Sequence, residues 1–100
     1  MGKTIVVTGG TKGIGYAILK RFAAEGFNLI TCSRNQAELE SVVLSLAEQY
    51  NVKVWHAVAD LSQKGEVMEF IHFVQSLERP IDVLVNNAGV FIPGAVHLEE

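Results

Sequence analysis

The segment covering residues 8–15, TGGTKGIG, contains four glycines directly after the apolar residues 5–7. At the carboxyl end of a buried strand, the backbone N–H groups of a turn and of the following helix point toward one place, which attracts anions. A phosphate group approaches such amides closely only where side chains are absent, which favours Gly9, Gly13 and Gly15 as the contact points. The segment therefore predicts a phosphate-binding loop, with an ordinary glycine-rich turn as the alternative.

Two common phosphate-binding patterns do not fit this segment. The fingerprint G-x-G-x-x-G, started at Gly13, requires glycine or alanine at a position that Ile18 occupies. The phosphate loop of nucleotide hydrolases requires Gly-Lys-Ser/Thr in that order, whereas Lys12 precedes Gly13. The spacing therefore argues against hydrolysis of a nucleoside triphosphate.

A second group of candidate residues follows the apolar residues 29–32. In dinucleotide-binding folds a carboxylate at the end of the second strand binds the ribose 2′-hydroxyl of NAD, while an arginine nearby accommodates the 2′-phosphate of NADP. Here the strand runs into Ser33 and Arg34, and the next acidic residue is Glu38. Ser33, Arg34 and Lys12 together offer a hydroxyl and two cations to a phosphate. This pattern predicts NADP(H), unless the two cations are solvated surface residues.

Strand and helix patterns alternate along the whole chain and position these residues. Short apolar or alternating runs predict strands at residues 4–8, 29–32, 52–58 and 81–85. Apolar residues at helical spacing predict three helices between them. The predicted buried helix positions are Ile14, Ala17, Ile18 and Phe22; Leu39, Val42, Val43, Leu46 and Tyr50; and Val67, Phe70, Ile71, Val74 and Leu77.

This alternation predicts an α/β fold, a doubly wound parallel sheet with helices on both faces. The first, second and fourth strands are almost continuously apolar, which is typical of strands buried on both faces. The connections are short, and nothing in residues 1–100 resembles a linker or a repeat. We therefore expect a single structural unit.

Composition excludes several classes of function. A net charge of −3 provides no basic field for nucleic acid or anionic lipid. The single cysteine, Cys32, rules out an internal disulfide, and the histidines at 56, 72 and 97 lack metal-ligand spacing. The first residues leave no room for a signal peptide, and the apolar runs are shorter than a membrane span. We expect a cytoplasmic protein with no metal site, no nucleic-acid partner and no membrane span.

Three motifs together resemble the short-chain dehydrogenase/reductase family. They are T-G-x-x-x-G-x-G in residues 8–15, Asp60-Leu61 after the third strand, and N-N-A-G in residues 86–89. The resemblance implies a Rossmann-type fold in which the Asp60 carboxylate binds the adenine amino group and the Leu61 amide binds a ring nitrogen. Alternatively, Asp60 caps a helix that starts near Ser62.

The resemblance also implies contacts from the last motif. The backbone of Asn87, Ala88 and Gly89 would lie against the cofactor ribose, and Asn86 would either brace the central strands or contact the cofactor. The full set of candidate cofactor-binding residues is Gly9, Thr11, Lys12, Gly13, Ile14, Gly15, Ser33, Arg34, Asp60, Leu61, Asn87, Ala88 and Gly89.

No catalytic residues are expected within residues 1–100. The family uses a tyrosine with a lysine four residues later, a serine and another asparagine, all beyond the N-N-A-G motif. Tyr16 and Lys20 have the tyrosine–lysine spacing, but they fall in the first helix, so we interpret them as a chance match. Residues 96–100 resemble a helix start, and a fourth strand without a neighbour would expose apolar surface. We therefore expect the amino-terminal part of a longer single-domain enzyme.

These observations predict an NADP(H)-dependent oxidoreductase that transfers hydride between nicotinamide and a carbonyl or alcohol carbon. Within the family, 3-oxoacyl-carrier-protein reductases are our first expectation, and sugar or short-chain alcohol dehydrogenases come next. The substrate would thus be a small molecule, free or bound to an acyl carrier, and the enzyme a homo-oligomer. Alternative hypotheses are a non-catalytic dinucleotide-binding module that senses redox state, and a flavodoxin-like or phosphate-loop protein that binds FMN or ATP.

Overall fold

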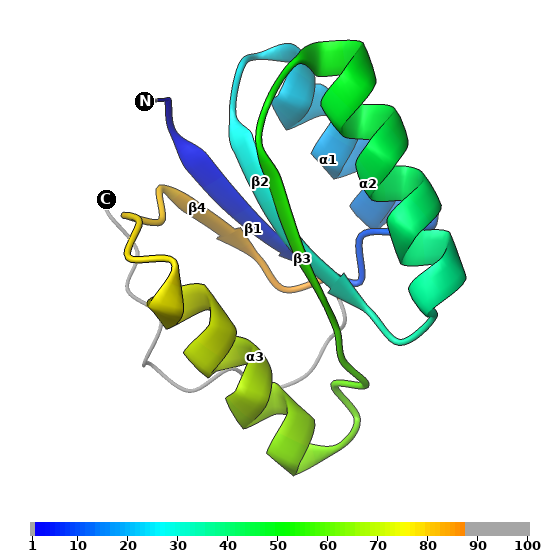
Figure 1. Cartoon of the computed structure of the whole chain (residues 1–100), viewed down its shortest axis with the longest axis vertical. Helices are drawn as coiled ribbons and strands as arrows, with labels where there is room; N and C mark the ends of the chain where they lie inside the picture. The colour runs from blue at the N-terminus through cyan, green and yellow to red at the C-terminus, as the bar shows by residue number, and fades with distance from the viewer. Residues whose placement is uncertain (1, 88–100) are drawn as a thin grey trace.

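The computed structural model describes residues 2–87 of the chain. In this part four parallel strands alternate with three helices (Figure 1). The elements are β1 Thr4–Thr8, α1 Gly13–Ala24, β2 Asn28–Ser33, α2 Gln36–Tyr50, β3 Val54–Val58, α3 Lys64–Ser76 and β4 Val83–Val85. The strand order is β3-β2-β1-β4. The predicted α/β fold, a parallel sheet of Rossmann type, is confirmed.

The helices cover both faces of the sheet, as the alternation predicted. Helices α1 and α2 lie on one face and α3 on the other (Figure 1). Successive residues of β1 point to opposite faces, so Ile5 and Val7 pack in the core beneath α1 and α2, while Val6 packs in the core beneath α3. All five residues of β1 are buried, which makes this strand the centre of the fold.

The buried face of α1 is shifted by one position from the predicted one. The buried residues of α1 are Gly15, Leu19 and Ala23, whereas Ile14 is 73% exposed. Leu19 and Ala23 pack in the core, and Gly15 lets the start of the helix lie against Gly9 and Gly10. This orientation leaves Ile14 at the surface. The prediction that Ile14 and Ala17 belong to the buried face is wrong.

Strands β3 and β4 are shorter than predicted. Helix α2 ends at Tyr50 and is capped by Asn51 in a left-handed conformation, φ 56°, so the chain is still turning where the strand was predicted to begin. Strand β3 starts at Val54. Strand β4 pairs with β1 from Val83, and its three residues are half-buried. The expected burial of the fourth strand on both faces is therefore not found in the described part of the chain, where β4 has only β1 beside it.

The topology brings the candidate residues to one edge of the sheet. All four strands are parallel, so the residues that follow β1, β2, β3 and β4 meet at the carboxyl edge. From β1 the chain continues to β2 and β3 on one side of the sheet, and then crosses to β4 on the other side of β1. The strand order therefore reverses between β1 and β4. Ligands of open α/β sheets bind in the crevice at such a switch point.

Candidate functional site

The glycine loop combines one open position with one tight position. Gly9 and Gly13 have left-handed φ angles of 67° and 56°, which glycine adopts without strain. A Cβ on Gly13 would meet no atom within 4 Å, so the space beside this residue is open. A Cβ on Gly15 would overlap the carbonyl oxygen of Gly9 and lie 2.7 Å from Nδ2 of Asn87. Gly15 is therefore required by packing, while Gly13 provides bare backbone at the surface.

Gly10 is a further glycine on which the fold depends, and the sequence did not single it out. A Cβ there would overlap Oγ1 of Thr31 and Cδ1 of Leu19. Thr31 donates its hydroxyl to the carbonyl of Val7 at 2.7 Å, so its side chain is fixed in place. Gly10 thus allows the start of α1 to lie directly on β2.

The amino end of α1 is suited to an anion. Lys12 is the N-cap, in an extended conformation with φ −140°, and its side chain makes no capping hydrogen bond. The first turn of the helix contains no acidic residue. Because the first N–H groups of a helix lack carbonyl partners within the helix and carry partial positive charge, this end favours a negatively charged ligand.

Both asparagines after β4 brace the loop region. Thr8 donates its hydroxyl to Oδ1 of Asn86 at 3.1 Å, which joins the ends of β1 and β4. Nδ2 of Asn87 donates to the carbonyl of Gly9 at 3.1 Å, which holds the glycine loop beside β4. The bracing interpretation of Asn86 has direct support from this contact. The other two predicted members of the motif, Ala88 and Gly89, lie outside the described residues.

A pocket of about 350 Å³ opens at the carboxyl ends of β1, β2 and β3. This volume falls within the range of small-ligand pockets, about 300–1,000 Å³. Its lining residues are Gly9, Cys32, Ser33, Arg34, Ala59, Asp60, Leu61 and Ser62. Five of the predicted cofactor-binding residues therefore line one cavity.

Asp60 closes a turn at the mouth of this pocket. Its Oδ1 accepts hydrogen bonds from the hydroxyl of Ser62 at 2.7 Å and from the Ser62 amide at 3.0 Å. These bonds from Ser62, with a smaller contribution from the charge of Arg34, lower the pKa of the Asp60 carboxyl. The N-cap of α3 is Gln63, so the alternative in which Asp60 caps the helix is wrong. The backbone amide of Asp60 donates to Oε1 of Glu66 at 2.6 Å, a contact that the sequence did not predict.

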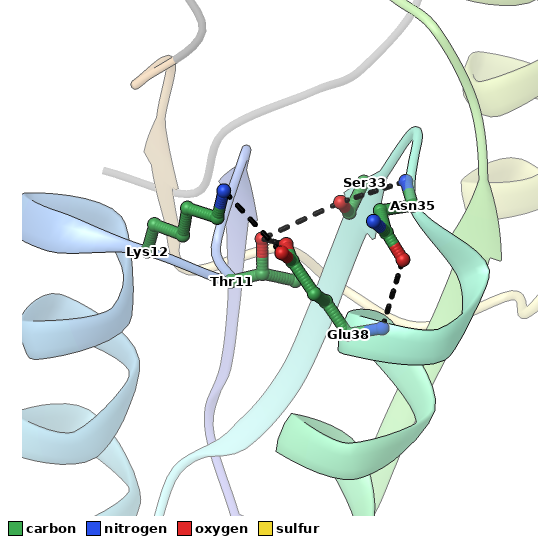
Figure 2. A network of polar contacts seen from close by, with 5 residues as sticks. All are labelled: Thr11, Lys12, Ser33, Asn35 and Glu38. Atoms are coloured by element: carbon green, nitrogen blue, oxygen red, sulfur yellow. Dashed lines mark hydrogen bonds and ion pairs between the residues drawn. The ribbon is translucent and has the colours of Figure 1, made fainter.

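The structure places a carboxylate beside Lys12, where the sequence predicted only donors. Figure 2 shows Nζ of Lys12 directed at Glu38 of α2, whose Oε2 is 3.3 Å away. The hydroxyl of Thr11 donates to Oε1 of the same residue at 3.5 Å and lies 3.4 Å from Oγ of Ser33. The expectation of an acid-free cationic site is therefore wrong, because Glu38 reaches the site through space although it is absent from the end of β2.

The start of α2 explains how Glu38 arrives there. Asn35 is the N-cap, and its Oδ1 accepts from the Glu38 amide at 3.0 Å. An acidic residue at this helix position commonly reaches back to the amide of the N-cap. Here the Asn35 amide donates to Oγ of Ser33 at 3.2 Å, and the Glu38 carboxylate is directed toward the glycine loop (Figure 2). The pair Asn35 and Glu38, three residues apart, was the signal in the sequence that could have placed this carboxylate near the strand end.

Arg34 lies on the pocket side of the site. It is exposed, lines the cavity with Asp60, and its charge acts on the Asp60 carboxyl. The two predicted cations thus face different carboxylates, Lys12 near Glu38 and Arg34 near Asp60. The site is a mixed-charge surface, in which any bound anion competes with carboxylates of the chain.

The remaining polar candidates behave as structural residues. Burial raises the pKa of the Cys32 thiol to about 11, which keeps it protonated and agrees with a packing role. Nζ of Lys20 lies 5.5 Å from the centre of the Tyr16 ring, so these two residues form a local contact on α1. Within residues 2–87 no three potential metal ligands gather, and no described helix has the length and hydropathy needed to cross a bilayer.

Comparisons with known proteins connect this geometry to a family. The family model described as short chain dehydrogenase matches residues 3–100. Chlorophyll(ide) b reductase NOL of Arabidopsis thaliana, a chloroplastic protein, is 39% identical over 85 residues, which is 85% of this chain and 24% of that protein. The human inactive hydroxysteroid dehydrogenase-like protein 1 is 38% identical over 93 residues, 92% of this chain and 28% of that protein.

A solved structure matches in fold as well as in sequence. The L-sorbose reductase of Gluconobacter frateurii, crystallised with NADPH and L-sorbose, superposes with a TM-score of 0.82 at 36% identity. The match covers 89% of this chain and 34% of that one. The chain therefore spans about a quarter to a third of the length of these proteins.

Proposed function

The chain belongs to the short-chain dehydrogenase family, and from this membership we propose that it forms the cofactor-binding part of an NADP(H)-dependent oxidoreductase. The enzyme would transfer hydride between the nicotinamide and a carbonyl or alcohol carbon of a small molecule. Residues 1–100 would be the amino-terminal portion of one longer domain, and the catalytic residues would lie outside them.

The residues at the carboxyl edge fit the parts of a dinucleotide. We assign the pyrophosphate to the amides of the loop from Gly9 to Gly15, where Gly13 has open space beside its Cα. The adenosine would occupy the pocket, with its adenine amino group donating to the Asp60 carboxylate. The 2′-phosphate would lie among Ser33, Arg34 and Lys12.

The division of labour follows from this placement. Bound nicotinamide supplies the hydride chemistry, and the protein supplies orientation and electrostatics. In this chain Asn87 holds the carbonyl of Gly9, and Gly15 keeps α1 against the loop, so the anion-binding amides are fixed before a ligand arrives. Fixed dipoles bind an anion without a cost of reorganisation.

One observation carries the proposal more than any other. The glycine loop, the pocket and a basic residue from each of two strand ends meet at the carboxyl edge of a parallel sheet. A site for FMN or ATP would not require cations beside the end of β2, where a 2′-phosphate would lie. The NADPH bound to the related L-sorbose reductase supports the same choice of cofactor.

Titration calorimetry with NADPH, NADH, FMN and ATP tests the proposal. We expect NADPH to bind most tightly and FMN and ATP to bind weakly or not at all. Failure of NADPH to bind would overturn the cofactor assignment, and preferred binding of FMN or ATP would indicate one of the alternative sites.

The Arg34→Asp variant tests the 2′-phosphate contact directly. A carboxylate at this position repels the phosphate and binds a ribose hydroxyl, so NADPH affinity should fall by about tenfold or more while NADH affinity is kept or improved. Arg21→Asp makes the same charge reversal on the exposed end of α1, where Arg21 pairs with Glu25, and should leave both affinities unchanged. Unchanged NADPH binding in Arg34→Asp would contradict the assignment.

A non-catalytic dinucleotide-binding module is the second candidate, because the human relative is described as inactive. Both candidates bind NADPH, but only an enzyme consumes it with a carbonyl substrate. The absorbance of NADPH at 340 nm, followed with ketones, sugars and 3-oxoacyl thioesters as substrates, separates the two candidates and also narrows the substrate class.

Reduction of 3-oxoacyl-carrier protein, a homo-oligomeric state and a cytoplasmic location stay predictions. One relative is chloroplastic.

A further inference from the structure

Glu38 contacts Lys12, one of the three residues that the proposed function assigns to the 2′-phosphate, and is linked to a second, Ser33, through Thr11. Its two carboxylate oxygens are taken by different residues of the glycine loop, Oε2 by Nζ of Lys12 at 3.3 Å and Oε1 by the hydroxyl of Thr11 at 3.5 Å. Thr11 in turn contacts Oγ of Ser33 at 3.4 Å (Figure 2). One carboxylate from α2 therefore sits among donors from both strand ends.

The hydrogen bonds around Glu38 form a series in which each residue donates to the next, ending at the Glu38 carboxylate. The Asn35 amide donates to Oγ of Ser33, which leaves the Ser33 hydroxyl hydrogen to donate to Oγ1 of Thr11. Thr11 donates to Oε1 of Glu38. Every donor in this series, and the ammonium of Lys12, is thus oriented toward an anion at the position of the carboxylate.

We propose that Glu38 is a specificity-determining residue that competes with the 2′-phosphate of the cofactor for Lys12 and Thr11. The inference rests on the proposed function, because it concerns the same dinucleotide site. To bind a 2′-phosphate among these donors, the ion pair between Lys12 and Glu38 must open. A cofactor with a free 2′-hydroxyl requires no such opening, since a hydroxyl can donate to the Glu38 carboxylate.

Charge decides the direction of the effect. A phosphate monoester carries about −1.5 to −2 at pH 7 and so binds Lys12 more strongly than a carboxylate does. It also lies close to the carboxylate it displaces, and that repulsion weakens binding. Glu38 therefore reduces the preference for NADP(H) over NAD(H) without reversing it. The side chain of Glu38 is 37% exposed, so salt should screen the effect.

The test compares Glu38→Gln with Glu40→Gln. Glutamine keeps the size of the side chain and its hydrogen-bonding oxygen and removes the charge. Glu40 lies on the same helix and bonds to Gln36 at 2.9 Å, away from the glycine loop, so its substitution makes the same change in net charge. The probes are adenosine 2′,5′-bisphosphate and adenosine 5′-monophosphate (AMP), which differ only in the 2′-phosphate. Their binding is measured by titration calorimetry on the complete protein at low and at high salt.

We expect Glu38→Gln to bind adenosine 2′,5′-bisphosphate about threefold to tenfold more tightly than the unmodified protein does, and the gain to shrink at high salt. AMP binding should stay within about twofold, and Glu40→Gln should change the affinity for neither probe, because an exposed charge outside the site is screened. Replacing Lys12 by methionine should reduce the gain from Glu38→Gln, because the contested cation is then gone. Circular dichroism melting checks that each variant is folded. If Glu38→Gln does not fold, Glu38→Asp replaces it; the shorter side chain reaches Lys12 less well, so this variant should show part of the same gain in affinity.

Two results overturn the inference in different ways. If the unmodified protein binds the bisphosphate but Glu38→Gln and Glu40→Gln behave alike, or if Glu38→Gln binds more weakly, then Glu38 does not compete and the proposed function still stands. If neither the bisphosphate nor NADPH binds to the unmodified protein or to any variant, the proposed function fails and the inference fails with it.

Discussion

Single residues at the carboxyl edge have unequal roles although several are of the same type. A Cβ on Gly13 would meet no atom within 4 Å, whereas one on Gly15 would meet Gly9 and Asn87. Gly15 therefore serves a packing contact, and the ligand contact proposed above falls to Gly13. Lys12 and Arg34 likewise differ, since each faces a different carboxylate. Residue type predicted which groups the site offers, namely bare backbone and two cations. The neighbouring residues decide whether each glycine is open or packed and which carboxylate each cation faces.

At Gly15, a single methyl group should disrupt the glycine loop. Gly15→Ala would place its Cβ against the carbonyl of Gly9 and near Nδ2 of Asn87, so the loop or α1 must shift. We expect a loss of about 1–3 kcal/mol in the free energy of unfolding, the usual cost of overpacking, together with at least tenfold weaker NADPH binding. Urea unfolding and calorimetry measure the two effects.

The matched control is Gly65→Ala at the start of α3. A Cβ there meets no atom within 4 Å, and alanine is the better helix former by up to about 1 kcal/mol. This variant should be as stable as the unmodified protein or more so, with unchanged NADPH affinity. Equal effects of the two substitutions would show that Gly15 has no special packing role.

Cys32 should make stability fall with pH above neutrality. Burial raises the pKa of its thiol from 9.0 to about 11, so between these pH values the unfolded chain loses the proton while the folded chain keeps it. The unfolded state then binds fewer protons, and the free energy of unfolding decreases as pH rises, by about 3 kcal/mol in all. In Cys32→Ala this contribution is absent, so the stability difference between the protein and the variant should shrink from pH 8 to pH 11. A constant difference in urea titrations would show that the thiol titrates normally.

Among the elements, helix α2 contributes most to the site through the way it begins. Asn35 caps the helix and holds the Glu38 amide, while Ser33 binds the Asn35 amide and so leaves the Glu38 carboxylate directed at Lys12. The cap therefore sets the stability of the helix and also the position of a charged group in the proposed cofactor site.

Removing the cap of α2 should cost more than the corresponding change at α3. Asn35→Ala deletes an acceptor for the Glu38 amide and should lower the free energy of unfolding by about 1 kcal/mol. Gln63 is the N-cap of α3 and makes no side-chain capping bond, so Gln63→Ala should cost almost nothing. Thermal unfolding of both variants checks the contrast, and equal losses would mean that the Asn35 bond adds no stability.

At the scale of the whole molecule, the described sheet is strongest at β1 and weakest at its borders. Strand β1 is wholly buried between β2 and β4, while the residues of β4 are half-buried and those of β3 are half-buried or exposed. Apolar strands with one paired side are prone to pair with another chain. The matched relatives are about two and a half to three and a half times as long as this chain.

A protein limited to residues 1–100 should therefore self-associate. We expect sedimentation velocity to show oligomers or aggregates at micromolar concentration, and thermal unfolding to be broad, because the apolar edge at β4 has no partner strand among the described residues. A monomer that unfolds in one sharp transition would contradict the proposal that these residues are part of a longer domain.

The sequence by itself determined the alternation of strands and helices, the parallel sheet and the position of the glycine loop, because these depend on local periodicity and on residues close together in the chain. It did not determine which face of α1 is buried, since that depends on the contact of Gly15 with the glycine loop and on the packing of Leu19 and Ala23 in the core. It also missed Glu38 at the proposed anion site, because 26 positions separate that residue from Lys12 and only the packing of α2 beside the loop brings them to 3.3 Å. Residue types that lie close together in the sequence predict which chemical groups a loop offers. The charge balance of the site depends on contacts between residues far apart in the sequence, which only the folded chain creates.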